Sequence, residues 1–411
     1  MMRRKFEEKE AIAREVLKMQ DWRTTPEEAK EYAEREIKEM NLPFTEYPNP
    51  QPEQFIPIPH EHPLPEHLRE RIVGMLIGEA VGDCIGVCGE GRLKEEVQYL
   101  YTNTDISLKT SVITEGTVRF MDDNCVLVDW TDDTDQMILI LDSLVHSNGT
   151  VDTKDLAQRM TYWLHFGFTE LGDLRGLGYG GTYRTAVSED TFLDDPIGST
   201  KTLVEEGYIR RSTDGSVMRT CVVSIPYFWD EQRVIENARL CGIMTHPSKE
   251  CQSSVTIVVS ILSKLLQGRT DVETIIQEAY DCGVKDLDNN EKLIQSLKKH
   301  VFATTLSELN LQKFMSHTMK PMACSIYALR RANQLLQSQM DKKEIFKTCL
   351  KEIIMEGGDT DTNCAVAGSV LGTYLTDECL PEDWMELKHL NWLKQRINGV
   401  LRLYELEPIQ Q

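Results

Sequence analysis

Apolar residues recur along most of the chain at the three- to four-residue spacing of amphipathic helices. After residue 145 this pattern predicts helices over Thr153–His165, Asp230–Met244, Cys251–Leu266, Val272–Tyr280, Asn290–Val301, Ala323–Gln337, Lys342–Met355 and Trp384–Asn398. The apolar–polar alternation of strands is missing, apart from a short extended piece expected around Val222 and Val223. Helices joined by short polar turns predict a compact, multi-helix, all-α fold.

Residues 1–65 differ from the rest of the chain. Residues 1–42 are rich in Glu, Lys and Arg, with sparse apolar positions at helical intervals, and eight prolines follow from Pro43 to Pro65. A Pro-rich segment of this kind forms an extended, semi-rigid connector. We therefore expect a helical arm and linker over 1–65 and an all-α domain over 66–411. The arm is expected either to pack on the domain or to contact a partner or second subunit, and its removal to leave a folded, active core.

The main domain opens with glycines that recur every four residues from Gly74 to Gly86. This spacing places them on one face of a helix and predicts a close contact with a neighbouring element. Gly89–Gly91 then lead the chain into a loop that carries Glu90. We expect the carboxylate of Glu90 to lie on a mobile hinge and Asp83 to be structural.

Two segments rich in Thr and Asp stand at the starts of predicted helices. Trp130–Gln136 reads WTDDTDQ and precedes an apolar helical stretch, and Met355–Gly372 reads MEGGDTDTNCAVAGSVLG. One such segment is explained by helix capping, since Asp and Thr side chains accept from the free amides of a helix N-terminus. Two of them are expected instead to face each other and share a pair of cations. Oxygen donors without sulfur or nitrogen suit Mg²⁺, Mn²⁺ or Ca²⁺ rather than zinc.

Other functional motifs are absent or weak. An EF-hand loop is excluded, because it would need Gly and Glu where Cys364 and Val370 stand. No GxxxxGK[ST] motif of a nucleoside triphosphatase occurs. The glycine-rich loops Leu171–Thr185 and Ser212–Arg219 can cradle a pyrophosphate through exposed amides. His246, in the sequence Thr-His-Pro, is by itself expected to be structural.

Composition and net charge limit the kinds of partner and the cellular compartment that we expect. The formal net charge of −21 excludes nucleic acid and anionic membranes as expected partners, and it disfavours an anionic small ligand unless bound cations reverse the local charge. The most apolar window, Val255–Leu266, is too short to span a bilayer. The 11 cysteines form no CxxC pair and no secretory signal is found, so we expect reduced thiols and a cytoplasmic protein, with the nucleus left open.

Taken together, the motifs resemble those of the ADP-ribosylglycohydrolase family, which includes the ADP-ribosylarginine hydrolases and the nitrogenase-reactivating glycohydrolase. The matching segments follow the family's order: Gly74–Glu90, WTDDT at Trp130–Thr134, DGSVMR at Asp214–Arg219, THP at Thr245–Pro247 and GGDTDT at Gly357–Thr362. They span about residues 70–375 and leave the N-terminal arm outside.

The resemblance implies an all-α fold with two Mg²⁺ ions, replaceable by Mn²⁺, at the bottom of an ADP-ribose cleft. The implied metal ligands are Thr131, Asp132, Asp133, Asp359, Asp361 and Thr362. The implied catalytic residues are Glu90, Asp132, Asp133 and Asp361, and the implied substrate-binding residues are Gly215, Ser216, Met218 and His246. Two departures bear on substrate preference: Asp214 replaces the family's usual Asn, and Gly178 stands where bacterial members often carry an Asp, with Asp173 as a loose alternative.

The implied activity is Mg-dependent hydrolysis of the glycosidic bond between ADP-ribose and a protein side chain or another acceptor. The expected partner is thus an ADP-ribosylated protein or an ADP-ribose-containing small molecule. Two cations can hold the ribose hydroxyls and activate a water, and Glu90 can act as general acid or base. Two alternatives stay open: a module that binds ADP-ribose without turnover, and a dinuclear-metal phosphoesterase. Retention of the four metal-site Asp residues argues against the first. The scarcity of basic residues in the motifs, where only Arg219 is available, argues against the second.

Overall fold

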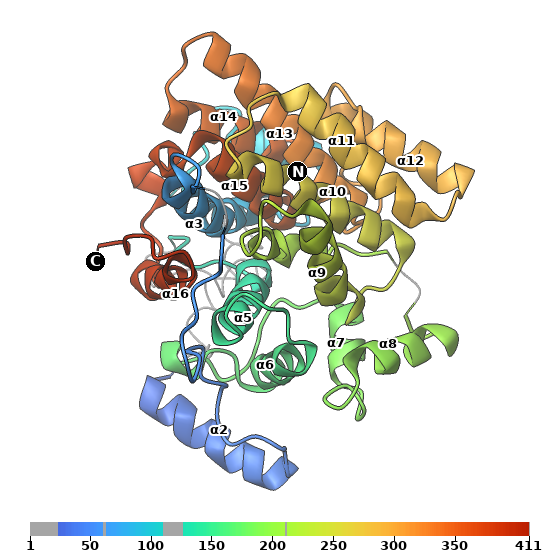
Figure 1. The fold of residues 1–411 in the computed structure, drawn as a ribbon. Coiled ribbons are helices and arrows are strands. Elements are labelled where there is room, and N and C mark those ends of the chain that lie inside the picture. The colour runs from blue at the N-terminus through green and yellow to red at the C-terminus, as the bar shows by residue number, and fades with distance from the viewer. Residues whose placement is uncertain (1–23, 61–62, 110–125, 210–211, 411) are drawn as a thin grey trace.

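The computed structural model describes residues 24–60, 63–109, 126–209 and 212–410, and in these ranges the chain is helical without a β-strand. The predicted all-α fold is confirmed. Two isolated bridges pair Arg92 with Gly358 and Thr213 with His317. In Figure 1 the helices α10 to α15 form the upper part of the body, and α5 and α6 lie below them.

Most helices lie where the apolar pattern places them. The observed bounds are α6 Thr153–Phe166, α9 Glu231–Ile243, α10 Lys249–Leu266, α11 Val272–Val284, α12 Glu291–Val301, α13 Met319–Gln337, α14 Lys342–Ile354 and α16 Leu390–Arg402. The largest deviation is at α16, because within its predicted range Trp384 ends a separate 3₁₀ helix, Glu382–Trp384, and residues 385–389 form an irregular segment before the helix begins at Leu390.

Several short elements differ from the prediction or were not predicted. Three are α4 (Lys94–Tyr101), α7 (Gly181–Val187) and α8 (Pro196–Glu205), which are too short to show a clear period. The extended piece expected around Val222 and Val223 is wrong. Both residues lie in a buried 3₁₀ helix, Cys221–Ser224, where packing against the core overrides the strand preference of β-branched residues.

At the centre of the fold, α3 (Leu68–Gly86) and α15 (Thr360–Leu375) pack against each other more closely than any other pair of helices. A Cβ atom added at any of the four α3 glycines would overlap a carbonyl oxygen of α15. The oxygens are those of Gly372, Gly368, Cys364 and Thr360, facing Gly74, Gly78, Gly82 and Gly86 in that order. The predicted close-packed helix is therefore confirmed. We call this contact the glycine seam.

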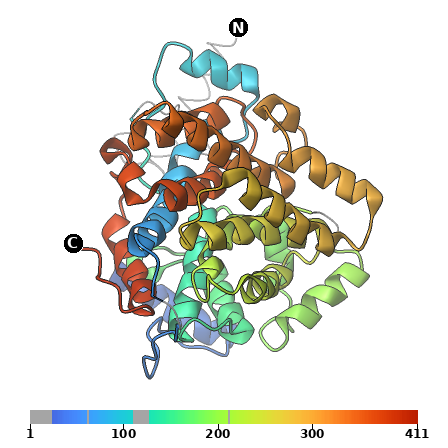
Figure 2. The same ribbon diagram turned by 45° about the horizontal axis from the view of Figure 1, so that its top comes forward.

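Helix α3 lies inside the body, with α5 and the C-terminal helices beside it (Figure 2). With its following turn, Leu68–Gly89, it is the one stretch among the described residues that is long and apolar enough to cross a bilayer. The apolar part of that stretch is buried within the fold, as is usual for the core helix of a globular protein.

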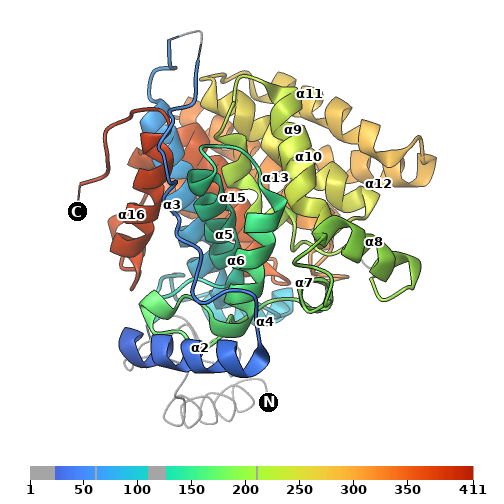
Figure 3. The ribbon, with the colours of Figure 1, turned by 60° about the horizontal axis from the view of Figure 1, so that its bottom comes forward.

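The described part of the N-terminal arm packs on the main body. Helix α2 (Pro26–Met40) lies across the end of α6, as Figure 3 shows, and buries Ala33 and Ile37 against Tyr162 and Phe166. Of the two expectations for the arm, packing on the domain therefore holds for this part. The apolar positions expected in residues 1–23 lie outside the described residues. The boundary at residue 65 and a contact of the arm with a partner stay predictions.

The linker after α2 also contacts the main body through buried polar groups. The hydroxyl of Tyr47 donates to Oδ2 of Asp142 at 3.0 Å, and Arg159 donates to the carbonyls of Pro48 at 2.7 Å and Asn49 at 3.1 Å. Asp142 and Arg159 are both completely buried. The linker thus supplies hydrogen bonds that the interior of the domain needs.

These contacts change what we expect from removing residues 1–65. The truncated protein should still fold, but its melting temperature should fall by about 5–10 °C. The reason is that buried polar groups left unpaired cost about 1–3 kcal/mol each. Removal of residues 1–23 alone is the matched control, because it leaves α2 and the linker in place. Thermal melting of the three proteins measures the effect, and equal melting temperatures for the full chain and the 66–411 fragment would contradict it.

Candidate functional site

The first acidic segment begins helix α5 (Asp132–His146), and α3 anchors it there. Thr131 caps the helix: its Oγ1 accepts from the amide of Asp133 and donates to Oδ2 of the same residue at 2.9 Å. From α3, Oδ2 of Asp83 accepts from the amides of Thr131 and Thr134 and from the Thr134 hydroxyl, at 3.0, 3.1 and 2.6 Å. Asp83 is thus structural, as predicted.

The second acidic segment begins α15, and α3 anchors this start too. The hydroxyl of Thr360 donates to the carbonyl of Gly86, the last residue of α3, at 2.6 Å. Asp359 occupies the cap position, and Asp361 and Thr362 lie in the first turn. One helix therefore fixes the starts of α5 and α15 relative to each other, which brings together acids that are far apart in the sequence.

Glu90 lies on a loop that is hydrogen-bonded to the segment before Asp359. The amide of Gly91 donates to the carbonyl of Gly358 at 2.8 Å, and the amide of Gly358 donates to the carbonyl of Arg92 at 2.9 Å. Oε2 of Glu90 accepts from the amide of Thr360 at 2.9 Å. Backbone pairing thus ties the loop to the Gly-Gly turn that precedes Asp359, and the mobility expected of this hinge stays a prediction.

The acids form a cluster that suits a cation. Ligand oxygens of Glu90, Asp359 and Asp361 all lie within 4.8 Å of one another. Burial, and next the charge of Asp359, raise the pKa of Glu90 to about 7. Burial, and next the charge of Glu90, raise the pKa of Asp361 well above its usual range. These carboxylates repel one another strongly unless protons or cations separate them.

Asp133 adds a buried oxygen to this cluster. Its Oδ1 atom is buried without a hydrogen-bond partner. Burial, and next the charges of Asp83 and Asp132, raise its pKa well above the usual range. A buried carboxylate oxygen without a donor fits a metal ligand, and an all-oxygen donor set fits a hard divalent cation such as Mg²⁺.

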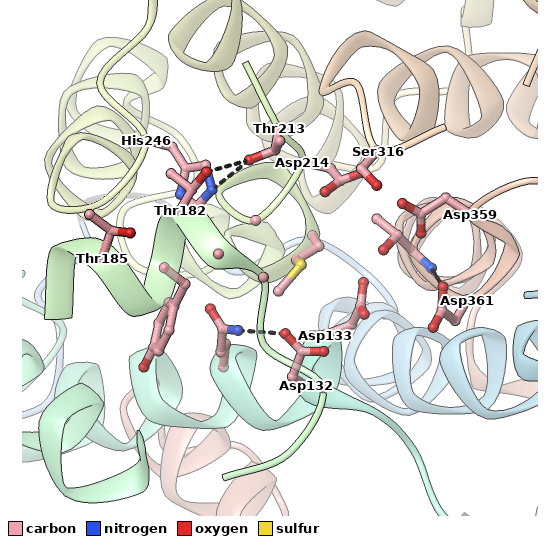
Figure 4. A pocket seen from close by; sticks show the side chains of 18 of the residues that line it. Asp132, Asp133, Thr182, Thr185, Thr213, Asp214, His246, Ser316, Asp359 and Asp361 are labelled. Carbon is pink, nitrogen blue, oxygen red and sulfur yellow. Dashed lines mark hydrogen bonds between the residues drawn. The ribbon is translucent and has the colours of Figure 1, made fainter. Parts of the chain in front are cut away.

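The cluster lies at one end of a cleft of about 630 Å³ (Figure 4). Of the predicted residues, those that line the cleft are Glu90, Asp132, Asp133, Gly215, Met218, His246, Asp359, Asp361 and Thr362. The other two lie behind its wall: Thr131 caps α5, and Ser216 is completely buried. The structure therefore brings together segments that the sequence could place only separately.

The two departures from the family pattern can now be placed. Asp214 lines the cleft with its carboxyl group against that of Asp359, and burial, then Asp359, raises its pKa well above the usual range. Gly178 also lines the cleft, at a φ of 95°, and a Cβ atom there would overlap Oδ1 of Asp132. A side chain at residue 178 would therefore displace Asp132. Asp173 is not part of the lining, and its Oδ2 accepts from the amide of Phe168.

Several lining residues escaped the sequence analysis. They are Gln136, Gly180, Gly181, Thr182, Tyr183, Thr185, Tyr208, Thr213 and Ser316. Most belong to the two glycine-rich loops, whose composition indicated a ligand without indicating which side chains face it. Tyr208 and Ser316 stand in segments without a motif, so no sequence signal marks them.

The body is all-α and its cleft is lined by acidic residues at the starts of two helices, and the comparisons give the family. The chain belongs to the ADP-ribosylglycohydrolase family, whose profile matches residues 64–410. An uncharacterized protein of Archaeoglobus fulgidus is 24% identical over 284 residues, or 68% of this chain and 81% of that protein. A solved structure of an ADP-ribosylglycohydrolase-related protein complex covers 82% of this chain and 99% of its own, with a TM-score of 0.58 and 19% identity. At that identity the likeness shows the fold.

Proposed function

We propose that this protein hydrolyses the glycosidic bond between ADP-ribose and a protein side chain or another acceptor, with two Mg²⁺ ions as cofactor and Mn²⁺ as a possible substitute. The observation that carries the proposal is the meeting of the α5 and α15 acids at one end of the cleft. The family is one of glycohydrolases acting on ADP-ribose linkages, which supports this class of reaction. A cytoplasmic location stays a prediction.

The ions would be held by Asp132, Asp133, Asp359, Asp361 and Thr362, with Glu90 close enough to contribute. Thr131 stays a predicted ligand as well, and its hydroxyl also donates to Oδ2 of Asp133 and so helps to position that acid. Bound there, the ions would supply a hold on the ribose hydroxyls and a lowered pKa of a nearby water. They would also offset the carboxylates, which otherwise repel the diphosphate of ADP-ribose.

The chain itself supplies the remaining functions. Glu90, at the edge of the cluster, is placed to accept a proton from the attacking water or to donate one to the leaving group. Gly215, Met218 and His246 form part of the opposite wall and would bind the ligand. The cleft encloses the reacting bond and limits the access of bulk water.

The burial of Arg219 is a further argument against the phosphoesterase alternative. Arg219, the one basic residue available in the motifs, is completely buried and donates to Gln136 and Thr245. It therefore faces the protein interior rather than the cleft. The remaining alternative, binding without turnover, is separated from the proposal by experiment.

The experiment measures release of ADP-ribose from ADP-ribosyl-arginine and ADP-ribosyl-serine peptides, beside a panel of phosphoesters. We expect release from at least one peptide, loss of activity in EDTA and recovery on addition of Mg²⁺. Hydrolysis of phosphoesters alone would contradict the proposal. Tight binding of ADP-ribose without release from any ADP-ribosyl linkage tried would favour the binding module.

A further inference from the structure

Arg219 is a buried cation whose hydrogen-bond partners are all neutral. It ends the 3₁₀ helix Val217–Arg219, and only 1% of its surface is exposed. Its Nη1 donates to Oε1 of Gln136 at 2.7 Å, and its Nη2 donates to Oγ1 of Thr245 at 2.7 Å. The face of the guanidinium lies 5.8 Å from the ring centre of Tyr183. Burying a charge costs free energy, which raises the question of which neighbouring groups Arg219 holds in position.

On the metal side, Arg219 fixes the amide of Gln136. A guanidinium can only donate hydrogen bonds, so the oxygen of the Gln136 amide must face it. The nitrogen of that amide must then face the other way, where it donates to Oδ2 of Asp132 at 2.8 Å. The orientation of Asp132, a proposed metal ligand, is therefore set by a residue that does not touch it.

On the opposite side, Arg219 fixes the hydroxyl of Thr245. Thr245 is completely buried, and its oxygen already accepts from Arg219. Its own proton needs an acceptor, and Nδ1 of His246 lies 2.7 Å away. In the part of the chain that the structure describes, no other hydrogen bond of this hydroxyl is found. Nδ1 of His246 is thus the acceptor, and the ring carries its proton on Nε2.

From His246 the series of hydrogen bonds continues into the cleft, with each group donating to the next. Nε2 lies 3.1 Å from Oγ1 of Thr213 and donates to it, and the Thr213 hydroxyl donates to Oγ1 of Thr182 at 3.3 Å (Figure 4). The Thr182 oxygen is then an acceptor within the protein, so its proton is left for the cleft that it lines. Each link in this sequence follows from the fact that Arg219 has no acceptor atom.

We propose that Arg219 is a positioning residue that orients both walls of the cleft, holding Asp132 for a cation on one wall and turning the Thr213 and Thr182 hydroxyls into donors on the other. An O–H donor suits an anionic oxygen such as those of the diphosphate in ADP-ribose. The identity of this ligand rests on the proposed function. The direction of the hydrogen bonds that begin at Arg219 does not rest on the proposed function.

Two further observations support this arrangement. Burial, and next the charge of Arg219, lower the pKa of His246 well below its usual range, so the ring is neutral and carries a single proton. The metal end of the cleft is lined by carboxylates, which accept hydrogen bonds and cannot donate them once ionised. Donors for an anionic ligand must therefore come from the other wall.

The binding test separates the two walls. We expect Gln136→Met to weaken Mn²⁺ binding by about 10-fold or more, the usual cost of losing a partner of a metal ligand. We expect Thr182→Val to leave Mn²⁺ binding unchanged and to weaken ADP-ribose binding, measured at saturating Mn²⁺, by about 10-fold. Arg219→Met should show both losses, and Arg219→Lys should show both in smaller measure. Thr202→Val, on the exposed face of α8, is the control for removing a hydroxyl.

A spectroscopic test reports the orientation itself. Two-bond ¹⁵N–¹H NMR spectra of histidine-labelled protein distinguish the two neutral tautomers, and the His246→Asn variant identifies the signal. We expect the Nε2–H tautomer in the wild type and a loss of that preference in Arg219→Met. A role of Arg219 in folding alone would not change the tautomer of a folded variant.

The proposal is overturned by an Nδ1–H tautomer in the wild type, or by a folded Arg219→Met variant with unchanged tautomer and unchanged binding. If Arg219→Met does not fold, unchanged binding in both Gln136→Met and Thr182→Val overturns it. Mn²⁺ binding and the tautomer are measured without ADP-ribose. A further outcome is a wild type that binds Mn²⁺ and shows the Nε2–H tautomer but fails to bind ADP-ribose. This result would refute the proposed function and the diphosphate as the ligand, and the positioning role of Arg219 would still stand.

Discussion

The Asp361→Asn variant is expected to lose its high-affinity binding of Mg²⁺ and Mn²⁺, by roughly 100-fold or more. A direct ligand should matter more than the groups that position ligands, whose loss costs about 10–100-fold. The substitution removes one charge at nearly constant volume, and it relieves the repulsion with Glu90 and Asp359. The metal-free variant should therefore be at least as stable as the metal-free wild type.

Calorimetric titration gives affinity and stoichiometry, and melting with and without Mg²⁺ gives an independent check. Mg²⁺ should raise the melting temperature of the wild type and leave that of Asp361→Asn almost unchanged, because only a ligand that binds the folded state stabilises it. Asp281→Asn, an exposed residue of α11, is the matched control. Unchanged affinity and stoichiometry in Asp361→Asn would contradict the proposed metal site.

The Glu90→Gln variant is expected to lower kcat by about 10²–10⁴-fold, the range of general acid–base groups. Its structural effect should be small, because a Gln side chain keeps an oxygen that can accept from the amide of Thr360. The loop is also held by backbone hydrogen bonds that the substitution does not touch. A loss of rate would therefore report the missing charge or proton rather than a displaced loop.

The measurement is made at saturating Mg²⁺, since Glu90 lies within reach of the same cation as Asp359 and Asp361. Turnover of both ADP-ribosyl peptides is compared with the affinity for ADP-ribose, which should change little. Glu95→Gln, on the exposed side of α4, controls for the loss of a nearby charge. If Glu90→Gln turns over as fast as the wild type, Glu90 takes no part in the chemistry.

The features that the sequence could predict are those with a local cause. The spacing of the glycines in α3 and the Thr and Asp residues at the starts of α5 and α15 act within one helical turn, so their pattern is visible in the chain. The rest depends on contacts between distant segments. The backbone pairing of Arg92 with Gly358, which holds Glu90, leaves no trace in either segment. Backbone hydrogen bonds require no particular side chain.

The same reasoning explains what was missed in the ligand cleft. From the sequence, Arg219 stood out only as the one basic residue in the motifs that could bind a phosphate. Its true partners, Gln136 and Thr245, lie on two other elements, and their side chains have no distinctive spacing. Likewise, the Pro-rich composition of the linker predicted a connector, and it could not show that the carbonyls of Pro48 and Asn49 complete the environment of Arg159.

The glycine seam limits how this protein can evolve. When two side chains clash, a second substitution can make room, so such pairs can change together over generations. At the seam, the atom that meets a new side chain is a main-chain carbonyl, which every amino acid carries. No compensating substitution on α15 can remove it. A side chain at any of these four positions would therefore have to move the backbones of α3 and α15 apart, and with them the start of α15 that carries Asp359 and Asp361.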